Sequence, residues 1–170
     1  HSIRRRQRQM CIRDSLFLLF LLINNLFSQS VFPNSKVQLM DNNKTDIYNL
    51  TSDVSFVSFW ATWCLPCLKE IDKLNDFIDE YDNVSVILIN EDKPGDKAKV
   101  KSFIRSRNYP VGDNYHIIFD FDKKLSRKFS AQPIPLTLIL KDNKVVYRKR
   151  GFYVGDEVEI RKELDKALSD

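Results

Sequence analysis

The chain has 170 residues, of which 43% are hydrophobic and 29% charged, which suits one globular domain with a buried core. Its formal net charge is +4, but five arginines and one aspartate within the first 14 residues account for all of it. The rest of the chain is therefore balanced near zero, and no basic patch indicates binding to nucleic acid.

Residues 1–30 have the order of a leader. An arginine-rich start precedes an apolar stretch at residues 16–23, and a small-x-small site follows at residues 28–30. This order is typical of a secretory signal peptide, and the apolar stretch is short for a membrane span. We expect export to the cell envelope or periplasm, with tethering by an uncleaved signal anchor as the alternative. The first fifteen or so residues, with an internal Met10, are atypical of a native start and carry no functional weight.

Residues 31–170 are predicted to form one domain of strands alternating with helices. Apolar runs between turn residues predict strands at 36–40, 45–48, 54–60, 84–89, 136–140 and 145–150. Amphipathic patterns predict helices at 64–81, 96–107, 122–129 and 156–168. Residues 115–119 are ambiguous between strand and loop, and Asp96 is a candidate helix cap. The order indicates an α/β fold: a mixed central sheet flanked by helices, with an extra N-terminal β-hairpin.

Cys64-Leu65-Pro66-Cys67 carries the strongest chemical signal, because it lies where a predicted strand passes into a predicted helix. A thiol at a helix N-terminus meets free N–H groups and the positive end of the helix dipole, which favour the reactive thiolate. Cys67 is near enough to resolve a mixed disulfide by forming an internal one. Pro66 suits the first helical turn, where a missing N–H costs nothing.

The same helix pattern separates an apolar face from a polar one. Its apolar residues recur at steps of three and four, and Lys69, Glu70, Asp72 and Lys73 are assigned to the other face. With the apolar face packed on a sheet, we expect Cys64 to be reachable and Cys67 to be shielded.

Two other interpretations of the cysteine pair are a metal site and an inert staple. Zinc sites usually need four ligands, and beyond this pair the chain offers Cys11 in the leader, His1 and His116. A bridge that closes so short a loop stabilises little, because loop-closure entropy grows with loop length. We therefore expect a redox-active disulfide, no metal and no organic cofactor.

Pro135 is the second chemical clue, since it stands immediately before a predicted strand. A proline there suits a cis peptide bond and leaves the backbone of Ile134 open to pair with an incoming peptide. A proline that simply begins a strand is the alternative.

Phe59-Trp60-Ala61-Thr62-Trp63-Cys64-Leu65-Pro66-Cys67, followed by Ile134-Pro135-Leu136-Thr137, resembles the thioredoxin superfamily. The leader and the N-terminal hairpin are similar to those of its exported TlpA/ResA-like branch of thiol–disulfide oxidoreductases. The resemblance implies a thioredoxin fold over residues 36–168.

The resemblance also implies roles for single residues. Cys64 would attack a substrate disulfide and Cys67 would resolve the mixed disulfide. Pro135 would be the cis-proline facing the disulfide, and Ile134 would offer its backbone to the substrate. Trp63 and Pro66 would shape the exposed rim.

One departure concerns proton transfer. Cytoplasmic thioredoxins carry a buried aspartate where this chain has Ser58. ResA-like proteins keep an acidic residue near the site, and Glu91 and Asp92 are the candidates here.

We therefore expect an exported reductant of protein disulfides, acting as a monomer. The resemblance implies apocytochrome c among its substrates and a membrane electron donor of the CcdA/DsbD type. One rival is an envelope oxidase or isomerase on the same fold, and another is a thiol-binding or chaperone module without turnover. A peroxidase is disfavoured, because no threonine–cysteine pocket pattern with a matching arginine surrounds Cys64.

Overall fold

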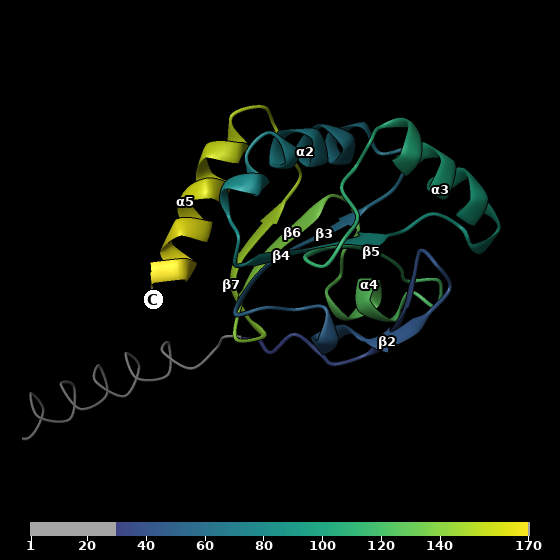
Figure 1. Ribbon diagram of the computed structural model, residues 1–170, viewed down its shortest axis with the longest axis horizontal. Coiled ribbons are helices and arrows are strands. Elements are labelled where there is room, and N and C mark those ends of the chain that lie inside the picture. The colour runs from purple at the N-terminus through teal and green to yellow at the C-terminus, as the bar shows by residue number, and fades with distance from the viewer. Residues whose placement is uncertain (1–29, 170) are drawn as a thin grey trace, which may run out of the picture. The chain divides into compact units, whose positions relative to one another are not determined.

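The computed structural model describes residues 30–169 (Figure 1). The predicted leader therefore lies outside the described residues, apart from Ser30. Within residues 30–169, no helix is both long enough and apolar enough to span a membrane.

The described residues form one seven-stranded sheet with helices on both faces. The strands are β1 Lys36–Leu39, β2 Lys44–Asp46, β3 Val54–Trp60, β4 Val84–Asn90, β5 Tyr115–Phe119, β6 Leu136–Lys141 and β7 Lys144–Arg150. The α-helices are α2 Leu65–Asn75, α3 Lys97–Ser106, α4 Lys124–Lys128 and α5 Asp156–Ser169. Short 3-10 helices, η1 Ile47–Asn49, η2 Ile78–Glu80 and η3 Pro94–Asp96, join them. The predicted α/β fold is confirmed, and the ambiguous residues 115–119 are a strand.

The sheet runs in the order β2-β1-β5-β4-β3-β6-β7. Strand β3 lies inside the sheet, parallel to β4 and antiparallel to β6. The predicted N-terminal hairpin, β1–β2, extends the sheet through antiparallel pairing of β1 with β5. Because β3 and β4 are parallel, their carboxyl ends meet at one edge of the sheet, and the cysteine motif follows β3 there.

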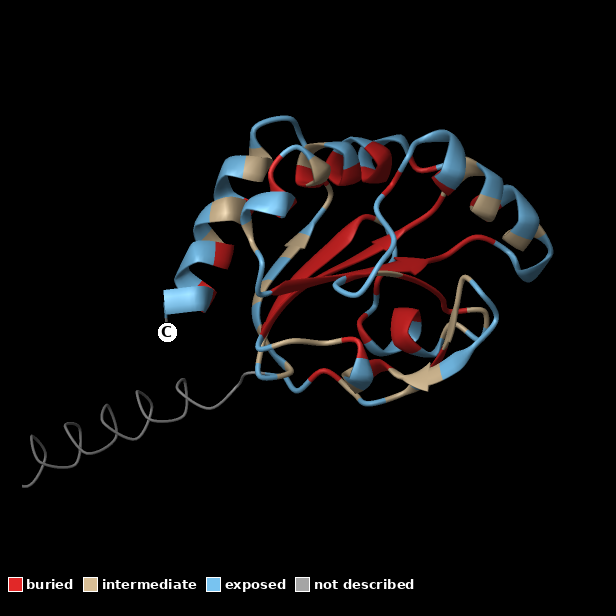
Figure 2. Ribbon diagram, viewed as in Figure 1, coloured by how far each residue is buried: buried red, intermediate tan, exposed pale blue. Residues whose placement is uncertain are grey.

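Two apolar cores cover the two faces of the sheet (Figure 2). Helices α2, α3 and α5 pack on one face, where Phe56 and Trp60 point from β3. Helix α4 and the segment around Phe32 cover the other, where Val57 and Phe59 point. This double burial explains why β3 is a continuous apolar run rather than an alternating one.

The motif helix is shorter than predicted, since α2 ends at Asn75 rather than at Tyr81. The chain turns after Asp76 and continues as η2, yet Phe77 and Ile78 remain buried in the same core. Apolar periodicity cannot separate one long helix from two short ones packed on the same surface. Asp96 does occupy the N-cap position of α3, but its side chain makes no capping hydrogen bond.

Candidate active site

The two cysteines lie at the junction of β3 and α2. Cys64 is the N-cap of α2 and forms a disulfide with Cys67, and their Cα atoms lie 5.3 Å apart. The backbone N–H of Cys67 donates to Sγ of Cys64, with a nitrogen–sulfur distance of 3.3 Å. In the reduced protein this amide and the helix N-terminus would favour a thiolate on Cys64.

The expected difference in access between the cysteines is small. Cys64 is 5% exposed and Cys67 is fully buried, so the only approach to the disulfide is through Cys64. The neighbouring Trp63 and Leu65 are 62% and 71% exposed, and Pro66 is also exposed. Exposed apolar side chains therefore flank the small exposed surface of Cys64.

The segment before β6 also lies beside Cys64. The Ile134–Pro135 peptide bond is cis, and the carbonyl oxygen of Ile134 lies 3.7 Å from Sγ of Cys64. Pro135 is buried and Ile134 is half-buried. The Gln132–Pro133 bond is also cis, a feature that the sequence pattern did not predict. Residues 70 positions apart in the sequence thus meet at the sulfur.

Glu70 is buried, so the prediction that places it on the polar, solvent-exposed face of the motif helix is wrong. It is 1% exposed and lies on α2 one turn after Cys67. The hydroxyls of Ser58 and Thr137 donate to its two carboxylate oxygens, one to each. Ser58 on β3 and Thr137 on β6 face each other in the register of the sheet.

Burial and hydrogen bonding act on this carboxyl in opposite directions. Desolvation is the larger effect and raises the pKa of Glu70 to about 7, while the hydrogen bonds from Ser58 and Thr137 lower it. Among the described residues, Glu70 forms no ion pair that would keep it ionised. Such an acid can take up or release a proton near neutral pH.

A signal for Glu70 was present in the sequence. Position 70 is three residues after Cys67 and four before Leu74, and both of those are buried. Ser58 and Thr137 were also polar residues within otherwise apolar strands. Ser58, Glu70 and Thr137 are thus three polar residues in apolar surroundings, and hydrogen bonds between them explain why all three are buried.

The two predicted acids, Glu91 and Asp92, have partners other than the cysteines. The Asp92 carboxylate accepts hydrogen bonds from the backbone N–H and the hydroxyl of Thr62, both at 2.8 Å. Glu91 is buried and pairs with Lys123 at 2.8 Å. Burial raises the pKa of Glu91, and Lys123 lowers it. Their proposed role in proton transfer stays a prediction, while the contact with Thr62 fixes the loop before Cys64.

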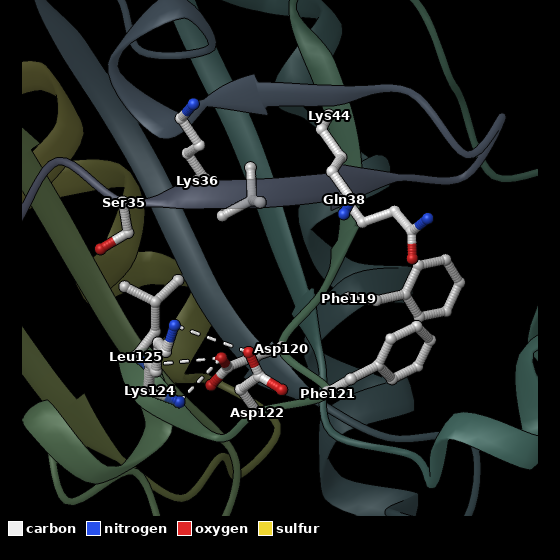
Figure 3. A pocket seen from close by; sticks show the side chains of 11 residues that line it. Ser35, Lys36, Gln38, Lys44, Phe119, Asp120, Phe121, Asp122, Lys124 and Leu125 are labelled. Carbon is white, nitrogen blue, oxygen red and sulfur yellow. Dashed lines mark hydrogen bonds and ion pairs between the residues drawn. The ribbon is translucent and has the colours of Figure 1, made fainter.

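A pocket of about 370 Å³ lies away from the cysteines, between the β1–β2 hairpin and the start of α4 (Figure 3). Stacked Phe119 and Phe121 form one side of it. Its buried acid, Asp120, accepts hydrogen bonds from the N–H groups at the start of α4. That carboxylate therefore stabilises the helix. Within residues 30–169, no three His, Cys, Asp or Glu side chains are grouped so as to bind a metal ion.

Comparisons with known proteins agree with this geometry. The AhpC/TSA family model matches residues 29–149. A comparison with curated protein sequences finds no match.

Among solved structures, the fold is similar to three bacterial proteins. A protein assigned as the thiol:disulfide interchange protein DsbE of Chlorobium tepidum is 20% identical, with a TM-score of 0.70 over 82% of this chain and 96% of that one. A thioredoxin-like protein of Porphyromonas gingivalis is 22% identical, with a TM-score of 0.69 over 81% of this chain and 92% of that one. An exposed lipoprotein thioredoxin of Streptococcus pneumoniae is 20% identical, with a TM-score of 0.61 over 79% of this chain and 99% of that one.

These likenesses establish the thioredoxin fold, and the disulfide at the helix N-terminus supplies the chemistry. Because the family model covers more than half of the sequence, the chain belongs to the AhpC/TSA family.

Proposed function

We propose that this protein is an exported reductant of protein disulfides. The observation that carries the proposal is the placement of Cys64, whose Sγ accepts a hydrogen bond from the Cys67 N–H and lies beside the Ile134 carbonyl oxygen. The amide favours the attacking thiolate, and the Ile134 backbone, which forms no backbone hydrogen bond among the described residues, suits a polypeptide substrate.

The reaction moves two electrons in two exchange steps. The Cys64 thiolate attacks one sulfur of the substrate disulfide, so that a mixed disulfide forms and the other substrate cysteine leaves as a thiolate. The Cys67 thiolate then attacks Sγ of Cys64, which closes the internal disulfide and releases the second substrate cysteine. The substrate is reduced, and the protein is left in the oxidised form described here.

Glu70 is suited to the second step. Cys67 must lose a proton before it attacks, and it is fully buried. Glu70 lies one turn away on the same helix, is also buried and has a pKa raised by burial to about 7. In this proposal its carboxylate accepts the Cys67 proton, and the hydroxyls of Ser58 and Thr137 keep both oxygens hydrogen-bonded.

The proposed substrate class follows from the surface around Cys64. Trp63, Leu65 and Pro66 present apolar surface around the sulfur, and the Ile134 backbone offers hydrogen-bonding groups. An extended polypeptide that carries a disulfide matches both features, and apocytochrome c is one such candidate. Two electrons from a membrane carrier of the CcdA/DsbD type would return the pair to the dithiol.

Export is supported by the leader pattern in residues 1–30. A structural relative is itself an exposed lipoprotein. In that compartment the mature chain would contain no cysteine other than Cys64 and Cys67, which avoids wrong pairing under oxidising conditions.

The test is to trap the substrate. A Cys67→Ser variant cannot resolve the mixed disulfide and should accumulate it with a protein substrate, whereas Cys64→Ser should neither trap nor turn over. Steady reduction of insulin disulfides by the wild type distinguishes an enzyme from a thiol-binding chaperone. Full activity in Cys64→Ser would contradict the mechanism.

A further inference from the structure

The backbone at Ile134 is the part of the site that a substrate polypeptide would meet. Among the described residues, neither its N–H nor its carbonyl oxygen forms a backbone hydrogen bond. The residues on both sides, Pro133 and Pro135, have no N–H to donate. The N–H groups of Ser130 and Ala131 donate to Arg127 and Ser126, but no N–H of residues 132–135 forms a backbone hydrogen bond. The carbonyl groups of residues 130–135 therefore need donors from elsewhere.

One residue of β7 supplies most of those donors. The guanidinium of Arg150 donates to the carbonyl oxygens of Ser130, Ala131 and Pro133, at 2.6, 3.1 and 3.0 Å. The next residue in the chain continues the contact, since the N–H of Gly151 donates to the carbonyl oxygen of Pro135 at 2.8 Å. The residues on both sides of Ile134 are thus held by Arg150, the last residue of β7, and by Gly151, which follows that strand.

The chemistry of this contact is specific to arginine. A guanidinium has five N–H donors in a rigid fork and can bridge several carbonyl groups, whereas an ammonium group is a compact point charge. Within residues 30–169, Arg150 forms no ion pair, so carbonyl groups are its hydrogen-bond partners. Its position is set by the sheet, because Arg150 lies opposite Leu136 in the pairing of β6 with β7.

We propose that Arg150 is a positioning residue of the substrate-binding edge. By tying residues 130–133 to β7, it holds the Ile134 backbone beside Sγ of Cys64, where a polypeptide next to the attacked disulfide would pair with it. The inference rests on the proposed function. It predicts that disulfides within polypeptides depend on Arg150, and that small disulfides without a peptide backbone do not.

The test compares Arg150→Lys with Arg148→Lys in the full chain. Arg148 lies on the same side of β7, but its guanidinium donates to the carbonyl of Phe129 alone, at 2.7 Å, farther from Ile134. In Arg150→Lys we expect the KM for insulin to rise about tenfold at nearly unchanged kcat, and the rate with 5,5′-dithiobis(2-nitrobenzoate) to stay within about twofold. Arg148→Lys should match the wild type in both assays. Arg150→Gln serves as the second variant should the lysine variant not fold.

Amide hydrogen exchange gives a readout that does not depend on turnover. Peptides covering residues 130–136 should exchange faster in Arg150→Lys than in Arg148→Lys. Unchanged exchange, or an unchanged KM for insulin beside an active wild type, would overturn the positioning role alone. A wild type that fails to reduce insulin would instead overturn the proposed function, with the exchange result still deciding whether Arg150 positions the segment.

Discussion

Two regions of the protein, the motif helix and the segment after β4, each bury a glutamate, but the hydrogen-bond partners of the two carboxylates differ. Glu70, on the buried face of the motif helix α2, has two hydroxyl groups as partners. Glu91, after β4, has the ammonium group of Lys123. Burial raises the pKa of both, but in Glu91 a cation opposes the rise directly. The partner therefore decides the role: an acid with hydroxyl partners can exchange a proton near neutral pH, whereas one paired with a lysine is suited to holding two loops together.

The largest expected effect is a difference between the two glutamates in the rate at which the mixed disulfide is resolved. Glu70→Gln should slow the resolution of the mixed disulfide by about a hundredfold, because Cys67 loses its proton acceptor. Glu91→Gln should leave that rate nearly unchanged. Single-turnover measurements with a preformed mixed disulfide would check this. Equal slowing in both variants would remove the distinction between the two regions.

The next effect is on stability as a function of pH. Burial raises the pKa of Glu70 from its ordinary value of 4.5 to about 7 in the folded protein. As pH rises from 4.5 to 7, the unfolded chain gains more from ionisation than the folded one, so folding should lose about 3 kcal/mol over that window. Glu70→Gln should remove this loss. Urea unfolding of the oxidised proteins at pH 4.5, 6 and 8 would measure it, and parallel curves for both proteins would contradict it.

A smaller effect concerns the ion pair of the second region. Glu91→Ala should destabilise the fold by about 2 kcal/mol, less than for a fully buried pair because the side chain of Lys123 is 35% exposed. Lys124→Ala is the control, since Lys124 pairs with Asp122 on the surface and its loss should cost below about 0.5 kcal/mol. Equal losses in the two variants would show that the Glu91 pair is no more than a surface contact.

The smallest effect sharpens the account of Glu70 itself. Its hydrogen bond from Ser58 lowers the pKa, so Ser58→Ala should raise it and move the pH midpoint of resolution upward by about one unit. The pH dependence of the single-turnover rate measures that midpoint. A downward shift would mean that the hydroxyl does not stabilise the ionised form.

The sequence predicted the fold well where one physical rule acted alone. Strand β3 has the predicted bounds, because in an α/β protein a short run of buried residues on both faces is typical of a strand covered by helices on each side. The sequence motif predicted the cysteine pair at a helix N-terminus, and the family resemblance predicted the cis bond before Pro135.

What the sequence could not supply were facts of three-dimensional pairing. Glu70 was assigned to the polar face because periodicity counts every glutamate as solvated, and its burial depends on hydroxyls from two other strands. The contacts of Arg150 with residues 130–133 needed the register of β6 with β7. The apolar pattern could not predict the end of α2 at Asn75, because Phe77 and Ile78 in the following turn are buried in the same core as the helix.

The most direct test of the central claim is the reduction potential of the Cys64–Cys67 pair. It is obtained by equilibrating the protein with dithiothreitol or glutathione buffers and quantifying the free thiols. The proposed reductant should have a value near or below that of thioredoxin, about −270 mV. A value near that of DsbA, about −120 mV, would identify an oxidant and contradict the proposed direction of electron flow.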